Sequence, residues 1–194
     1  MKRQKPKYKQ IIDAAVRVIA ENGYHSSQVA KIAKEAGVAD GTIYLYFKNK
    51  EDILVSVFKE KMGQFIDRIQ KKIEQQANAS DKLYAMIKTH FEQLSEDYQL
   101  AVVAQLELRQ SKKDLRLQIN QVLKQYLNII DQIIEEGKTE HLFKKDLSLP
   151  LVRQMIFGTL DETVTTWVMQ ERSYDLLKLT DDVHQLIVHG IRQP

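Results

Sequence analysis

Apolar residues recur along most of this chain every three or four positions, which is the spacing of amphipathic α-helices. No segment of useful length alternates with a period of two, so strands are not expected. The pattern predicts an all-α protein of about nine helices. These begin near residues 7, 26, 40, 49, 80, 100, 115, 148 and 175, after short polar or glycine-containing breaks.

The ends of these segments carry residues that favour helix termini. Ser26 and Ser27 are candidate N-caps for the second helix, and Asn49 is one for the fourth, which extends to about residue 76. Gly37 and Gly137 are expected to end the second and the seventh helix. The second and third helices, joined by a tight turn with a glycine, have the pattern of a helix-turn-helix motif.

The third helix is short and has two different sides. At 100° per residue, Ile43 and Phe47 share a face, which we expect to pack against the neighbouring helices. Gly41, Leu45 and Lys48 lie on the opposite side. The sequence therefore predicts an exposed apolar side with a positive edge.

Such a side suits the major groove of DNA. Its glycine allows close approach, Leu45 can contact a thymine methyl, and the hydroxyls of Thr42 and Tyr44 can bond to phosphates or base edges. Lys48 and Lys50 flank the start of the fourth helix, whose free N–H groups also attract phosphate. The alternatives are a surface for a partner protein and a harmless exposed leucine, which is common in soluble proteins.

Charge is distributed unevenly along the chain. Residues 1–50 hold ten Lys and Arg against four Asp and Glu, whereas the remainder holds nineteen against twenty-two. A basic N-terminal part favours a polyanionic partner, although a chance cluster of solvated lysines explains this fact alone equally well. In the arm KRQKPKYK, Arg3, Lys5 and Lys7 would add salt-dependent affinity for the duplex backbone; an ordinary frayed terminus is the alternative.

Composition excludes several classes of protein. With 43% hydrophobic and 28% charged residues, the chain is expected to fold, and the absence of cysteine excludes thiol catalysis, thiolate metal sites and disulfides. No secretory leader or membrane-spanning run is present, so a cytoplasmic location is expected. No nucleophile motif, phosphate loop or metal-ligand spacing occurs, so neither an enzyme nor a metal site is expected.

The stretch IAKEAGVADGTIYLYFKNKEDIL closely resembles the DNA-binding signature of the TetR family of bacterial repressors. The resemblance covers about the first third of the chain and implies an all-helical homodimer whose C-terminal domain binds a small effector. It implies phosphate contacts from Thr42, Tyr44 and Lys50, and positions facing the groove at Gly41 and Leu45. Asp40 departs from the family pattern and could cap its helix instead of touching DNA. The full set of candidate DNA-contacting residues is Lys5, Ser27, Gln28, Gly41, Thr42, Tyr44, Leu45, Tyr46, Lys48 and Lys50.

The remainder of the chain has features of a binding domain. LAVVAQLEL is apolar nearly all round and is followed by Arg109, and MIFGTLDETVTTWVM forms a wide apolar face with hydroxyls. A plain core with a dimer interface explains most single residues of these stretches. QLELRQS and RQMIFGTLDETVTTWV resemble a TetR subgroup that represses fatty-acid degradation genes and is released by long-chain acyl-CoA. The resemblance implies an effector site lined by Phe65, Phe91, Leu94, Val102, Val103, Leu106, Arg109, Tyr126, Ile130, Ile156, Leu160 and Trp167.

Together these observations predict a helix-turn-helix DNA-binding domain over residues 1–48 and a ligand-binding and dimerisation domain over residues 49–194. We expect a repressor that binds palindromic operator DNA as a homodimer through its last two helices and has long-chain acyl-CoA as effector. A TetR-type repressor induced by a drug or another lipid is the nearest alternative. An acyl-binding carrier protein, whose basic part contacts proteins, is the alternative from another class.

Overall fold

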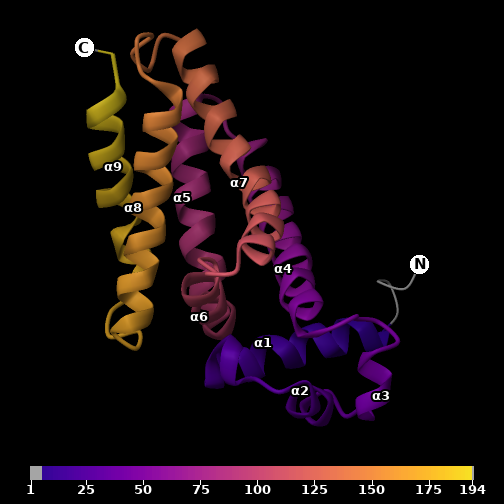
Figure 1. The fold of residues 1–194 in the computed structure, drawn as a ribbon. Coiled ribbons are helices and arrows are strands. Elements are labelled where there is room, and N and C mark those ends of the chain that lie inside the picture. The colour runs from indigo at the N-terminus through magenta and orange to yellow at the C-terminus, as the bar shows by residue number, and fades with distance from the viewer. Residues whose placement is uncertain (1–5, 194) are drawn as a thin grey trace. The chain divides into compact units, whose positions relative to one another are not determined.

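The computed structural model describes residues 6–193, which fold into helices joined by short turns (Figure 1). The helices are α1 (Pro6–Ser26), α2 (Val29–Glu35), α3 (Asp40–Ile43), α4 (Lys50–Ile73), α5 (Ala79–Glu96), α6 (Tyr98–Glu107), α7 (Lys113–Thr139), α8 (Leu149–Met169) and α9 (Thr180–Ile191), with a 3₁₀ turn η2 (Leu176–Leu179) before α9. The all-α fold is confirmed, and these described residues contain the nine α-helices that were expected. Phe143 and Arg192 form an isolated antiparallel β-bridge.

The chain divides into two compact units that do not follow its linear order. The first joins the residues up to Gly63 with Tyr98–Val122, and the second joins Gln64–Asp97 with Leu123–Pro194. Helix α6 therefore belongs with α1 to α3, and the division falls inside α4 and inside α7. The boundary expected after residue 48 stays a prediction.

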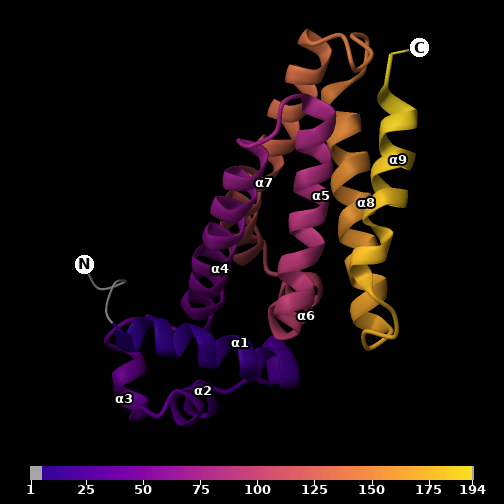
Figure 2. The same cartoon turned by 180° about the vertical axis from the view of Figure 1, so that it is seen from behind.

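The first unit is built around a core in which α1 contributes one complete face. Helices α1 and α6 pack together, and α2 lies against both α1 and α3, as the opposite views of Figures 1 and 2 show. The rings of Tyr8 and Phe47 stack with centroids 5.2 Å apart. Burying each large apolar side chain stabilises the fold by about 1.5–3 kcal/mol. The largest fully buried aliphatic side chains of this core are Ile11, Ile19, Ile32, Ile43, Ile53 and Leu54.

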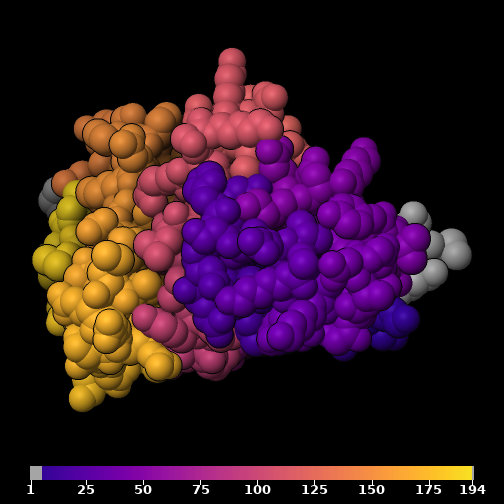
Figure 3. Space-filling view, turned by 60° about the horizontal axis from the view of Figure 1, so that its bottom comes forward, coloured from indigo at the N-terminus to yellow at the C-terminus, as the bar shows by residue number. Residues whose placement is uncertain are grey.

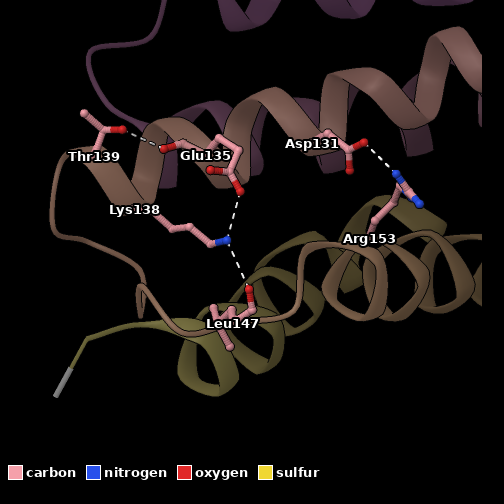
Figure 4. Close-up of polar contacts among 6 residues, drawn as sticks. All are labelled: Asp131, Glu135, Lys138, Thr139, Leu147 and Arg153. Atoms are coloured by element: carbon pink, nitrogen blue, oxygen red, sulfur yellow. Dashed lines mark hydrogen bonds and ion pairs between the residues drawn. The ribbon is translucent and has the colours of Figure 1, made fainter.

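The second unit contains α5, α8 and α9, which pack against one another in pairs (Figure 2). Polar contacts tie α7 to the segment that leads into α8 and to α8 itself. Arg153 donates to Asp131 across 2.6 Å, and Lys138 donates to Glu135 and to the carbonyl oxygen of Leu147 (Figure 4). These contacts fix the start of α8 against the end of α7.

Several expected helix ends are wrong, and the last helix begins at Thr180 and not near residue 175. Two of the other differences have a clear physical reason. The second helix begins at Val29, with Gln28 at its N-cap, because the hydroxyl of Ser27 donates to the carbonyl oxygens of Gly23 and Val18 instead. Helix α7 does not stop at Gly137 but continues to Thr139. A side chain at Gly137 would overlap the ring of Phe143, since an added Cβ would lie 2.1 Å from its Cδ2 atom.

Other ends agree more closely with the sequence pattern. Asn49 caps α4 through a bond from the Asp52 N–H to its side-chain oxygen, 2.8 Å long, although α4 ends at Ile73 and not near residue 76. Gly23 interrupts helical geometry at the end of α1 with a φ of 70°, a conformation in which glycine is favoured. No helix within residues 6–193 is both long enough and apolar enough to cross a membrane.

Candidate nucleic-acid interface and effector site

Helix α3 has the two-sided character that its sequence predicts. Ile43 is fully buried and Phe47 nearly so, which anchors the short helix in the core of the first unit. On the other side, Tyr44 is 59% and Leu45 65% exposed. Gly41 is also exposed, and a Cβ added there would meet nothing within 4 Å. Gly41 in α3, together with Tyr44 and Leu45 directly after it, thus forms an exposed surface with open space beside the Gly41 backbone.

Figure 3 shows the face that the N-terminal helices α1 to α3 make in the space-filling view. Gln28 and Lys48 are exposed, and Thr42 is half-buried. Asp40 lies in the first turn of α3 without being its N-cap, which is Ala39, so its expected capping role is wrong. An acidic residue in the first turn still stabilises a helix through the macrodipole.

Other candidate DNA-contacting residues have different surroundings from those expected. Ser27 is 1% exposed and its hydroxyl is used inside the fold, so its side chain is corrected to a structural role. Tyr46 is half-buried, with its ring centroid 6.2 Å from that of Tyr8. Lys5 lies outside the described residues.

Lys50 holds the end of α1 and does not extend freely toward solvent. Its ammonium group donates to the carbonyl oxygens of Tyr24, at 3.1 Å, and His25, at 2.9 Å. The same Nζ atom lies 4.7 Å from the centroid of the Tyr24 ring, within reach of a cation–π interaction. Two of its three N–H donors are therefore directed at the backbone that follows the Gly23 bend.

Tyr24 also connects α1 to α6. Its N–H donates to Oε1 of Glu107, the last residue of α6, across 2.8 Å in a buried position. The other carboxylate oxygen of Glu107 accepts from Nε2 of Gln110 at 2.7 Å. Burial, together with the carboxylates of Glu51 and Glu107, raises the pKa of Tyr24 to about 12. We call the contacts of Tyr24 with Glu107 and Lys50 the Tyr24 junction; sequence reasoning missed it, because its members are far apart in the chain.

Several candidate effector residues come together in the second unit. The ring centroids of Phe65 and Phe157 each lie 6.0 Å from that of Tyr126. His90 sits among them, with its Nδ1 atom 2.9 Å from the Tyr126 hydroxyl. No motif or spacing in the sequence distinguishes this histidine from the other four. The other buried candidates of this unit are Phe91, Leu94, Ile130, Ile156, Leu160 and Trp167.

The candidates on and after α6 have other surroundings. Val103 packs in the core of the first unit. Leu106 is half exposed, so α6 is not buried all round as its composition predicted. Val102 is half-buried and Arg109 is exposed. Their part in an effector site stays a prediction.

A seven-residue helix, a turn through Gly37 and a short helix with an exposed apolar side define a helix-turn-helix DNA-binding protein. The family described as bacterial regulatory proteins, tetR family, matches residues 11–57. The family described as YsiA-like protein, C-terminal region, matches residues 58–190. The chain belongs to the TetR family and is a transcriptional regulator, not an enzyme.

Proteins similar to this chain include regulators of fatty-acid metabolism. The fatty acid metabolism regulator protein of Bacillus subtilis is 62% identical over 191 residues, covering 98% of each chain. A crystal structure of the regulator FadR from Bacillus subtilis in complex with stearoyl-CoA matches with a TM-score of 0.92 and covers 95% of this chain and 99% of its own. The fatty acid degradation regulator FadR from Bacillus halodurans also matches with a TM-score of 0.92, at 57% identity, covering 95% of this chain and all of its own.

Proposed function

We propose that this regulator represses fatty-acid degradation genes and that long-chain acyl-CoA releases it from its operator. The observation that carries the proposal is the likeness to the Bacillus subtilis regulator. It extends over both units at 62% identity, and the matching structure of that regulator contains stearoyl-CoA. As a regulator of bacterial genes, the protein acts in the cytoplasm.

In this proposal α3 enters the major groove of the operator. Leu45 contacts a thymine methyl, Gly41 leaves room for the DNA, and Thr42 and Tyr44 donate hydroxyls to phosphates or base edges. Lys48 adds a positive charge at the edge of the contact. The exposure of the Leu45 side chain, which is 65%, supports this geometry because it leaves the side chain accessible to a base edge.

The acyl chain of the effector occupies the apolar interior of the second unit. Burial of each methylene contributes about 0.8 kcal/mol, so a chain of roughly sixteen carbons supplies on the order of 10 kcal/mol. Allosteric release needs about 1–3 kcal/mol of this as a difference between two conformations. The binding energy is therefore sufficient for induction.

A homodimer through α8 and α9 completes the proposal, because two α3 helices then contact two half-sites of a palindrome about 34 Å apart. Val183, Ile187 and Ile191 are buried within the fold itself. The exposed apolar residues of α8 and α9 available to a partner subunit are instead Leu151, Met155, Met169 and Leu186. Gly158 and Gly190 are exposed as well, and a Cβ at either would meet nothing.

The test begins with a duplex that the protein itself selects from a random library, followed by fluorescence anisotropy with increasing palmitoyl-CoA. We expect binding of a palindromic sequence and its loss on adding palmitoyl-CoA. If a hydrophobic drug released the protein from this duplex and palmitoyl-CoA did not, acyl-CoA would be wrong as the effector and the drug-induced alternative would be favoured. Failure to select any duplex would favour the acyl-carrier alternative.

A matched pair of variants tests the docking geometry. Leu45→Asp places a negative charge on the exposed surface that directly follows α3, and Leu117→Asp makes the same change at a leucine of α7 that is 49% exposed. Repulsion from phosphate is expected to weaken DNA binding by Leu45→Asp at least tenfold, about 1.4 kcal/mol. Leu117→Asp is expected to bind as the unaltered protein does. Equal affinity of the two variants would contradict docking through α3.

A further inference from the structure

His90 on α5 is a buried histidine of the second unit, and several aromatic rings lie around it. Its ring meets that of Phe65 edge to face at 5.2 Å and that of Phe91 at 5.9 Å. Its Nδ1 atom is 2.9 Å from the hydroxyl of Tyr126 on α7, and both residues are buried. Its Nε2 atom is buried and has no hydrogen-bond partner among the described residues. Buried polar atoms without a partner are rare in folded proteins and call for an explanation.

Counting hydrogens decides what kind of partner Nε2 requires. Among the described residues, the Tyr126 hydroxyl bonds to Nδ1 of His90 alone. If Nδ1 carried the proton, both the Tyr126 O–H and the bare Nε2 would lack partners. If the Tyr126 O–H donates to Nδ1, a single N–H, on Nε2, is left unsatisfied. The second arrangement is favoured because each unmet buried group is destabilising, and it presents Nε2–H as a donor that needs an acceptor.

The electrostatics of this place favour a neutral acceptor. Burial lowers the pKa of His90 from 6.5 to about 3, so the ring carries no charge at neutral pH. Burial and the carboxylate of Asp161 on α8 raise the pKa of Tyr126, so the hydroxyl keeps its proton. A carboxylate brought here would lose its hydration without gaining a cation, and it would face the charge of Asp161. A carbonyl oxygen has neither disadvantage.

We propose that Nε2–H of His90 donates to the carbonyl oxygen of the thioester of a bound acyl-CoA, so that this residue selects acyl thioesters. The inference rests on the proposed function, since it assigns a contact within the same effector site. A saturated acyl chain has no polar group of its own, and the thioester carbonyl is the first acceptor at its end. The His90–Tyr126 pair therefore recognises the activated form of the fatty acid.

The experiment compares two ligands on the full-length protein by isothermal titration calorimetry. Palmitoyl-CoA has the carbonyl, whereas S-hexadecyl-CoA is a thioether with a methylene in its place and is otherwise the same. One net hydrogen bond corresponds to about a 3- to 10-fold preference for palmitoyl-CoA. His90→Phe should bind both ligands with equal affinity. His184→Phe, which alters a half-buried histidine of α9, should keep the preference of the unaltered protein.

The outcomes separate this inference from the proposed function. Equal binding of the two ligands by the unaltered protein would overturn the role of His90 and leave the acyl-CoA effector standing; a buried water would then satisfy Nε2. Binding of neither ligand would overturn both proposals. If His90→Phe does not fold, the comparison on the unaltered protein decides, and a new downfield Nε2–H proton signal with palmitoyl-CoA supports the contact. Absence of that signal in the saturated complex would contradict it.

Discussion

The Tyr24 junction provides the sharpest test of how the first unit is held together. Glu107→Ala removes the carboxylate that accepts the N–H of Tyr24 at 2.8 Å and the side-chain N–H of Gln110 at 2.7 Å. The two donors differ in the hydrogen bonds that remain after the substitution. Gln110 keeps a bond to the backbone oxygen of Glu107 at 3.2 Å, whereas the Tyr24 N–H loses its acceptor. The cost of the substitution is therefore mainly that of one buried, unsatisfied backbone donor.

The size of this cost follows from the burial of the site. Glu107 is 9% and Tyr24 4% exposed, so water does not readily replace the lost acceptor. A buried donor left without a partner costs about 1–3 kcal/mol, and relief from burying a carboxylate offsets part of it. We expect Glu107→Ala to lower the free energy of unfolding by about 2 kcal/mol, which corresponds to a Tm lower by roughly 4–8 °C. Glu107→Gln should lose less, because its amide oxygen still accepts from Tyr24.

The measurement is urea unfolding followed by circular dichroism, at a fixed protein concentration because dimer formation would couple stability to concentration. Glu96→Ala is the matched control. Glu96 on α5 pairs with Arg68 through two bonds of 2.6 and 3.1 Å, but its side chain is 60% exposed. Exposed ion pairs contribute about 0–1 kcal/mol. If Glu107→Ala were no more destabilising than Glu96→Ala, the buried bond to Tyr24 would not stabilise the first unit as argued.

Three further predictions concern other parts of the molecule. Lys50→Met should weaken DNA binding without changing the slope of log affinity against log salt, because the ammonium holds backbone carbonyls; a slope smaller by about 0.9 would show a phosphate contact instead. Leu186→Glu, at a side chain 74% exposed on α9, should convert the dimer to a monomer in light scattering at unchanged helix content; a persistent dimer would place the interface elsewhere. Burial keeps His90 neutral in the folded protein, where its pKa is about 3, whereas in the unfolded chain it binds a proton below about pH 6.5. The free energy of unfolding therefore falls as the pH decreases from 6.5 toward about 3. Between pH 7 and 5 the unaltered protein should lose about 2 kcal/mol more than His90→Phe in urea unfolding, and an equal loss would contradict a buried neutral ring.

Much of the fold could be predicted because the deciding information is local. The positions of Ile43 and Leu45 on opposite sides of the expected third helix follow from helical geometry alone. The burial of one and the exposure of the other agree with it, although α3 itself ends at Ile43. The cap at Asn49 and the bend at Gly23 are likewise properties of a few adjacent residues. The resemblance to the TetR signature also predicted the helix-turn-helix.

The remaining features depend on contacts between distant parts of the chain. Lys50 carries the charge expected of a phosphate contact, yet the carbonyls of α1, 25 and 26 residues away, receive its N–H groups. Gly137 is of the residue type that commonly ends a helix, but α7 continues past it. The absence of a side chain there allows the ring of Phe143 to pack closely against the helix. No sequence motif contains His90, and its hydrogen-bond partner Tyr126 lies 36 residues later in the chain. Periodicity carries no information about which distant element approaches a given face.

The magnitudes of the contacts at Tyr24 bear on how a repressor of this kind can be released. An effector shifts a conformational equilibrium only by its difference in affinity for two states, typically about 1–3 kcal/mol. Such a ligand could not break a polar contact between α6 and α1 that stabilised the fold by far more than this. A contact that stabilised it by much less would contribute little to the position of α1. The single buried bond from Tyr24 to Glu107 lies within this range, as do the two bonds from Lys50. These polar contacts, which supplement the apolar core of the first unit, are therefore of a size that the binding energy of acyl-CoA is sufficient to rearrange.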